Sequence, residues 1–222
     1  APRLRNLRSD ESQVAGHRMS EWFRNRDWNE AIAAAFDHKL KRARDKKQYL
    51  RIQACTLARS HPRIALELLD RYFSLGDHFD HAQAHVDRAT AHLALGDMES
   101  AIHSYEAAVE RELAFPNLRT GASLDLPYLI AVNGIVGRFE QAVEMLSGSG
   151  DGLMFPVDRF KHHAARALIL ARGDLVAART EAKAALEAAA LAHSGFRYQP
   201  TVGLVSEEHA HALSRLRGLL DA

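Results

Sequence analysis

The chain has 222 residues, of which 47% are hydrophobic, 26% charged and only 7% aromatic, and its formal net charge is +1. This length is ample for a buried core, but no apolar run reaches the ~18 residues that a membrane-spanning helix needs. The single cysteine, Cys55, excludes an internal disulfide framework and indicates a reducing compartment, so we expect a cytoplasmic protein.

Charge is distributed unevenly along the chain. Residues 1–51 carry 13 Lys/Arg and 7 Asp/Glu, whereas residues 52–222 carry 16 and 21. This division predicts a positive end and a mildly negative body. Residues 1–10 lack a periodic apolar face, and we expect them to form a flexible basic arm. Because the sequence begins at Ala1 rather than methionine, a preceding leader or domain remains open.

The rest of the chain shows apolar residues at helical spacing and almost no β-branched runs, which predicts an all-α fold. Asp45 is placed to cap one helix, and Pro62 is tolerated in the first turn of the next. The expected helices are 11–25, 28–44, 46–60, 62–75, 78–95, 98–113, 125–137, 139–146, 157–172, 175–193 and 206–220.

Two features near the C-terminus carry their own expectations. The connection 194–205 is unusually apolar, so we expect it to dock on the 175–193 helix or beside a binding groove. The side chains that would dock are Phe196, Tyr198, Val202 and Leu204. In the terminal helix the leucines should face inward, while His209, His211, Arg215 and Arg217 are expected mostly on the polar side.

Residues 82–109 hold two helical patterns joined at Gly96-Asp97. Ala89, Ala101 and Ala108 stand where two helices must approach closely, and Tyr105 would fill the space between them. Similar turn–alanine patterns recur around Ala31, Ala65, Ala142 and Ala178, so that the anchor alanines, with Ala101, are 34, 36, 41 and 36 residues apart.

This pattern resembles the tetratricopeptide repeat family, whose period is ~34 residues. The resemblance implies a right-handed α-solenoid of about five helical hairpins plus a C-terminal capping helix, in a single domain spanning 11–222. The expected units are about 11–44, 45–76, 78–114, 124–147 and 156–193, with the capping helix at 206–220.

In this family the first helix of each unit lines a concave groove that binds partner segments. The resemblance therefore implies a non-enzymatic protein–protein interaction scaffold without catalytic residues, cofactor or metal, whose partner the sequence does not name. Lys47 and Arg51 resemble half of a basic clamp for a terminal carboxylate, although its asparagines are missing. The residues expected in the groove are Lys47, Arg51, Gln83, Asp87, Thr90, Tyr128 and His163.

Two other functions stay open at the level of sequence. The basic run 38–51 could contact nucleic acid phosphates, as part of a longer transcriptional regulator, or simply be a solvated helix surface; Tyr49 is its only aromatic residue. Third, an enzyme or metal site could use the histidine stripe formed by His78, His81, His85 and His92. Cys55 is expected to be a small buried thiol.

Overall fold

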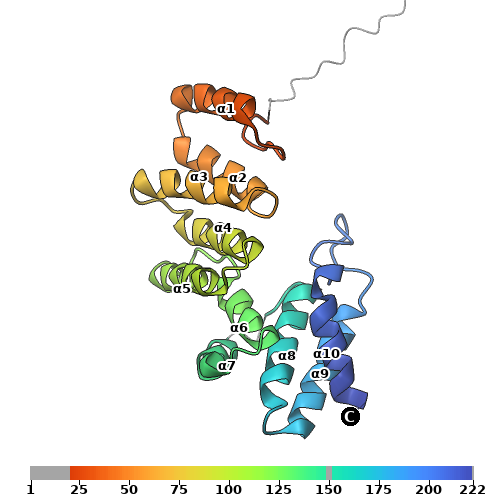
Figure 1. The fold of residues 1–222 in the computed structure, drawn as a ribbon. Coiled ribbons are helices and arrows are strands. Elements are labelled where there is room, and N and C mark those ends of the chain that lie inside the picture. The colour runs from red at the N-terminus through yellow and green to blue at the C-terminus, as the bar shows by residue number, and fades with distance from the viewer. Residues whose placement is uncertain (1–20, 149–151, 222) are drawn as a thin grey trace, which may run out of the picture. The chain divides into compact units, whose positions relative to one another are not determined.

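The computed structural model describes residues 21–148 and 152–221, and every regular element among them is a helix. The all-α prediction is therefore confirmed for this part of the chain. The chain divides into two compact units, Ala1–Gly76 and Asp77–Ala222, which we describe separately (Figure 1). Their boundary coincides with the expected boundary between the second and third hairpins. The right-handed solenoid stays a prediction.

The first unit contains three described helices, α1 (Glu30–Arg42), α2 (Lys46–Leu57) and α3 (Pro62–Ser74). Asp45 caps α2 as predicted, because its Oδ1 accepts a hydrogen bond from the Gln48 amide at 3.0 Å. Pro62 occupies the start of α3, where its missing amide donor costs nothing. These local signals place both helix starts correctly.

Residues 21–29 form an irregular segment where a helix was expected to continue to residue 25. The rest of that predicted helix lies outside the described residues. The buried Gln53 side chain accepts from the Asn25 amide and side chain, both at 3.0 Å, and donates to the Asn25 carbonyl at 2.8 Å. Trp22 packs its ring 4.8 Å from that of Tyr49. These contacts satisfy the backbone without helical bonds, so the predicted helix end is wrong.

The second unit begins with the hairpin of α4 (His81–Ala94) and α5 (Met98–Ala114). Ala89, Ala101 and Ala108 expose no surface, and Tyr105 is buried beside them. The turn forms at Gly96, which adopts a φ of +76°, and Asp97 then caps α5 through the Ser100 amide. The predicted close approach of two helices at small residues is confirmed.

The next hairpin pairs α6 (Ala122–Val132) with α7 (Phe139–Ser147), joined through a short 3₁₀ turn, η1 (Val136–Arg138). The predicted limits of the first helix, 125 and 137, are wrong. The helix starts earlier because the Gly121 carbonyl accepts the first bonds, from the amides of Leu124 and Asp125. It ends earlier because Gly134 adopts a φ of +65°, which stops a helix.

The last hairpin consists of α8 (Pro156–Leu170) and α9 (Leu175–Ala189), followed by η2 (Glu207–His209) and α10 (Ala210–Asp221). α10 packs on α9 and α8, so a terminal helix covers this hairpin as expected. Leu216 is fully buried, with Leu213, Leu219 and Leu220 partly buried against the same core. His209 is buried too, and its predicted place on the polar side is wrong.

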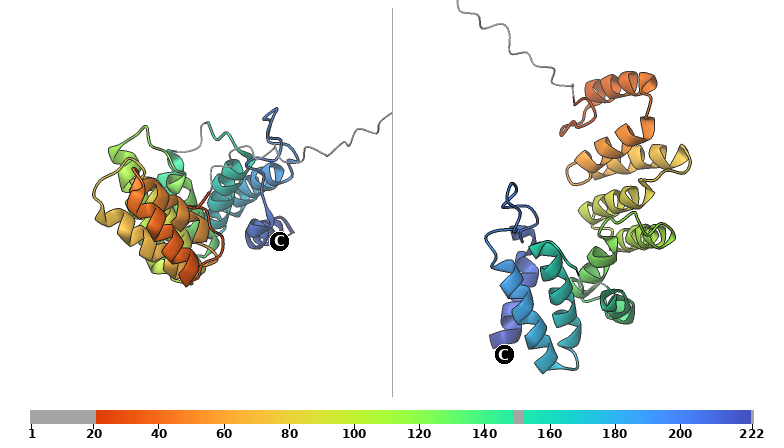
Figure 2. Two further views of the ribbon diagram at one scale, coloured as in Figure 1. Left: turned by 90° about the horizontal axis from the view of Figure 1, so that it is seen from above. Right: turned by 180° about the vertical axis from the view of Figure 1, so that it is seen from behind.

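The apolar connection 194–205 docks, but at the start of α8 rather than on α9. The Gly203 carbonyl accepts a hydrogen bond from the Val157 amide at 2.8 Å, and the Phe196 ring lies 5.4 Å from that of Phe155. Tyr198 is 85% exposed, so its predicted burial is wrong. Figure 2 shows this connection projecting beyond one end of the α8–α10 bundle. Docking is thus confirmed in part.

Two ion pairs join side chains that are 34 residues apart. Within the first unit, Arg71 on α3 lies 2.7 Å from Asp37 on α1; within the second, Arg111 on α5 lies 2.6 Å from Asp77. Asp37 and Arg71 hold equivalent positions after the anchor alanines Ala31 and Ala65. This first pair therefore joins equivalent positions of successive repeats, which fits the repeat period read from the sequence, whereas Asp77 and Arg111 stand at different offsets from their anchor alanines.

In residues 21–148 and 152–221 four helical hairpins are complete: α2/α3, α4/α5, α6/α7 and α8/α9. Of the expected first hairpin, the described part contains only α1. No helix among these residues combines the length and apolarity needed to cross a membrane.

Candidate functional site

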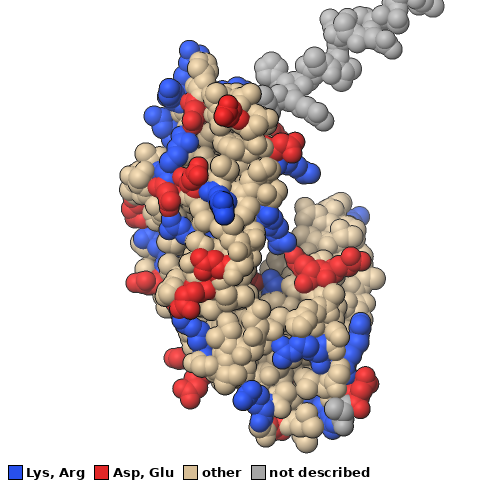
Figure 3. Space-filling view, viewed as in Figure 1, with Lys and Arg blue, Asp and Glu red and all other residues tan. Residues whose placement is uncertain are grey.

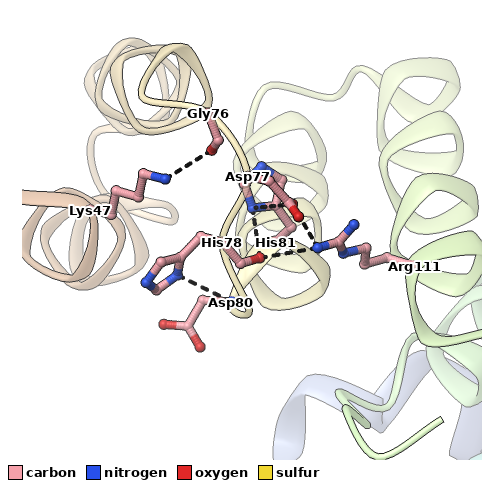
Figure 4. A network of polar contacts seen from close by, with 7 residues as sticks. All are labelled: Lys47, Gly76, Asp77, His78, Asp80, His81 and Arg111. Atoms are coloured by element: carbon pink, nitrogen blue, oxygen red, sulfur yellow. Dashed lines mark hydrogen bonds and ion pairs between the residues drawn. The ribbon is translucent and has the colours of Figure 1, made fainter. Parts of the chain in front are cut away.

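The basic face of α2 carries the first two predicted groove residues, one helical turn apart. Both Lys47 and Arg51 are half-buried. The Lys47 ammonium donates a hydrogen bond to the Gly76 carbonyl at 3.1 Å, at the end of the first unit (Figure 4). The main chain therefore engages one of the three donors of the Lys47 ammonium.

The surroundings of the basic run 38–51 weigh against nucleic acid binding. Tyr49, its only aromatic residue, is packed between Trp22 and Phe23, with ring centroids 4.8 Å away in each case, so it is engaged in packing. Figure 3 shows positive and negative side chains interspersed over α1 to α3 on the face in view. Although Lys and Arg are in excess within 38–51, a mixture of both signs over the three helices is typical of a solvated helix surface.

The three predicted groove residues on α4 differ in accessibility. Gln83 and Thr90 are half-buried, but Asp87 is only 4% exposed, so its predicted partial exposure is wrong. Asp87 accepts a hydrogen bond from the Gln83 side chain at 3.2 Å, and the Thr90 hydroxyl donates to the Val86 carbonyl. A buried carboxylate requires hydrogen-bond donors, and the Gln83 side chain supplies one to Asp87.

The histidines of the stripe make separate contacts with different parts of the protein. The His81 ring meets the His78 carbonyl at 3.0 Å (Figure 4). His92 lies 3.5 Å from Asp97. Burial, with the positive charge of Arg88 nearby, lowers the pKa of His85 to about 4. Across the described ranges, no three His, Cys, Asp or Glu side chains are arranged to hold a metal ion.

Tyr128, which is predicted for the groove, forms a contact between α6 and η2. Its hydroxyl lies 2.8 Å from Nδ1 of His209, and burial raises the Tyr128 pKa and lowers the His209 pKa. Phe160 packs 5.2 Å from the same imidazole ring. Tyr128 is partly exposed but positioned by packing, and His209 had no sequence signal because 81 residues separate the pair.

His163, the last predicted groove residue, pairs within its own hairpin. Its Nδ1 lies 2.7 Å from Glu181 on α9, which also receives a hydrogen bond from Arg166 at 2.6 Å. Burial opposes ionisation of Glu181, but these two hydrogen bonds lower its pKa overall. Among the predicted groove residues of the second unit, Gln83 and Asp87 are joined by a hydrogen bond.

Cys55 is exposed, and the expectation of a buried thiol is wrong. It lies on α2, next to the buried Ala54. A helix turns about 100° per residue, so adjacent side chains face different directions. Cys55 therefore faces outward on α2, although the adjacent Ala54 faces inward.

A hollow of about 590 Å³ opens in the second unit where α5, α7 and α8 come together with the connection after α5. Its apolar wall contains Val109, Leu113, Met145 and Leu153. Three carboxylates and one guanidinium also line it, from Glu112, Glu144, Asp158 and Arg119. The sequence analysis missed this site, because its lining comes from four separate stretches of the chain.

The comparisons with known proteins leave the family open. No family model, no curated protein and no solved structure matches this chain.

Proposed function

We propose that this protein is a non-enzymatic scaffold, built of tetratricopeptide-like hairpins, that binds a segment of a partner protein. The observation that carries the proposal is the open, partly apolar hollow between α5, α7 and α8. Its volume lies within the range of ~300–1,000 Å³ found for binding pockets. An apolar centre beside charged groups is also the usual anatomy of a protein interface.

Large apolar side chains near the hollow support the same function. Leu113 on α5 is 77% exposed, and Phe115 and Val143 are exposed as well. Phe115 directly follows α5 and Val143 lies on α7, and these two helices also line the hollow. Exposed apolar side chains of this kind are available for contact with a partner.

The first helices of two hairpins, α2 and α4, offer a second surface to a partner. Lys47, Arg51, Gln83 and Thr90 are partly accessible, and the resemblance to repeat proteins assigns them to a partner-binding surface. The hollow and these faces are thus two alternative routes for a bound segment.

Site-specific photo-crosslinking distinguishes the routes. A benzophenone amino acid would replace Lys47, Thr90 or Leu113 one at a time, with Val176, an exposed residue on α9, as the control position. The variants would be irradiated in a lysate of the native host and the adducts identified by mass spectrometry. We expect one partner to be captured at one or more test positions and not at Val176. Equal capture at all four positions, or none at any, would contradict the proposal.

A further inference from the structure

We propose that the hollow between α5, α7 and α8 binds a partner peptide that presents large apolar side chains flanked by arginine or lysine. This inference rests on the proposed scaffold function and adds the chemistry of the bound segment. Its evidence is the combination of an apolar wall with an excess of carboxylates in one hollow.

The apolar wall of the hollow favours an apolar side chain on the bound peptide. Val109 and Leu113 lie one turn apart on α5, and Met145 and Leu153 approach from α7 and from the segment before α8. Transfer of apolar surface from water into such a hollow is favourable by ~25 cal/mol per Å². A flexible methionine in the wall lets the hollow adapt to side chains of different shape.

The charges around the hollow favour a cationic group on the bound peptide. Glu144 and Asp158 are two of its three carboxylates, and the backbone of Phe155 donates a hydrogen bond to the Asp158 carboxylate. The third, Glu112, already accepts a hydrogen bond from the Thr120 amide at 2.6 Å. Lys161, near Asp158, is held 2.7 Å from Asp125. Among the lining residues Arg119 carries the one positive charge against three carboxylates, and Lys161 behind the lining also attracts the Asp158 carboxylate.

Asp158 makes the cation preference stronger than charge counting alone. The residue is half-buried in the first turn of α8, and burial raises its pKa. A carboxylate that has lost part of its hydration gains most from a guanidinium or ammonium, which supplies both charge and hydrogen-bond donors. The Phe155 backbone and the Lys161 charge offset only part of this lost hydration, and an acidic or uncharged segment would add nothing to them.

The test is an NMR titration of the full chain with three short peptides. The probe is acetyl-Gly-Arg-Leu-Leu-Arg-Gly-amide, and the comparison peptides replace both arginines with glutamate or both leucines with serine. We expect the probe to shift amide resonances within 109–124, 144–148 and 152–158. Its dissociation constant should be lower than those of both comparison peptides by about tenfold or more.

Two variants locate the binding. Leu113→Arg places a cation in the wall at an exposed position and should weaken probe binding about tenfold or more, whereas Val176→Arg, equally exposed on α9, should leave it unchanged. The double variant Glu144→Gln with Asp158→Asn should reduce the difference between the arginine and glutamate peptides. Heteronuclear spectra of each variant verify that it is folded.

Several results would overturn this inference. Equal binding of the serine peptide would mean nonspecific attraction, and shifts confined to other helices would mean a different site. Absence of shifts at millimolar probe would exclude the site outright. The scaffold function is tested separately by the crosslinking experiment. Crosslinks at Thr90 or Lys47 without binding in the hollow would retain the scaffold function and reject only this site.

Discussion

At the scale of single residues, alanines set how closely the helices of the second unit approach. Ala89 and Ala101 face each other across the α4/α5 hairpin, and neither exposes any surface. Interiors of this density leave no room for added methyl groups. The small side chain is therefore a geometric requirement at these positions, and helix propensity alone does not explain it.

Ala101→Leu should overpack this hairpin and lower the free energy of unfolding by about 1–3 kcal/mol, because the helices must separate to admit the larger side chain. Urea denaturation followed by circular dichroism measures the change. Ala114→Leu, at the exposed end of the same helix, is the matched control and should change stability little. A loss of only a few tenths of a kcal/mol in Ala101→Leu would show that the contact is not tight.

Buried histidines make stability depend on pH. Burial lowers the pKa of His85 to about 4 and also lowers the pKa values of His162 and His209. The unfolded chain therefore binds more protons than the folded one below pH ~6.5. Stability should fall as pH decreases from 6.5 toward 4, by at most about 1.4 kcal/mol per pH unit for each such group.

Thermal unfolding between pH 7 and 4.5 checks this expectation. His85→Gln should reduce the loss of stability on acidification, because it removes the histidine whose pKa burial lowers to about 4. His103→Gln, at an exposed position on α5, should leave the decline unchanged. A stability that rises on acidification would contradict the burial of these neutral imidazoles.

At the scale of elements, the connection 194–205 shows how an irregular segment is fixed. Gly203 adopts a φ of +65°, and a Cβ there would lie only 2.5 Å from the Phe155 ring. Backbone and aromatic ring therefore touch directly, and this contact places the chain just before α10. This glycine therefore acts together with the packing of α10 on α8 and α9 to fix the position of the terminal helix.

Gly203→Ala should release this connection, because the new methyl group collides with Phe155 and the backbone conformation disfavours alanine. We expect faster tryptic cleavage after Arg197 and a lower melting temperature. Gly195→Ala is the matched control: Gly195 lies in the same connection with a φ of +89°, but open space surrounds its Cβ position. Similar cleavage rates in the two variants would show that docking on Phe155 does not hold the segment.

At the scale of the whole molecule, the positive N-terminal part and the mildly negative remainder suit a scaffold that discriminates partners by charge. Lys47 and Arg51 lie one turn apart on α2, and the hollow with its three carboxylates belongs to the second unit.

Replacing Lys47 and Arg51 together by alanine should weaken binding of the crosslinked partner with little change in melting temperature. The Lys47 hydrogen bond to Gly76 is exposed, and bonds of this kind contribute little to stability. Isothermal titration measures the affinity, with Lys39→Ala/Lys41→Ala on α1 as the charge-matched control. Unchanged affinity in the Lys47/Arg51 variant would remove these residues from the binding surface.

The sequence by itself determined the helical class, most helix starts and the repeat spacing. Signals such as Asp45, Pro62 and the Gly96-Asp97 turn act within a few residues, so each can be read locally. The anchor alanines could be read because helix packing imposes small residues at a regular spacing.

Only the tertiary structure decided which side chains are accessible and which meet. The Gln53–Asn25 bonds join residues 28 positions apart and replace a predicted helix, while the Tyr128–His209 contact joins residues 81 apart and buries a histidine expected outside. The apolar hollow likewise draws its lining from separate helices. The physical reason is that burial and hydrogen bonding depend on which distant elements pack together, and local sequence patterns do not contain that information.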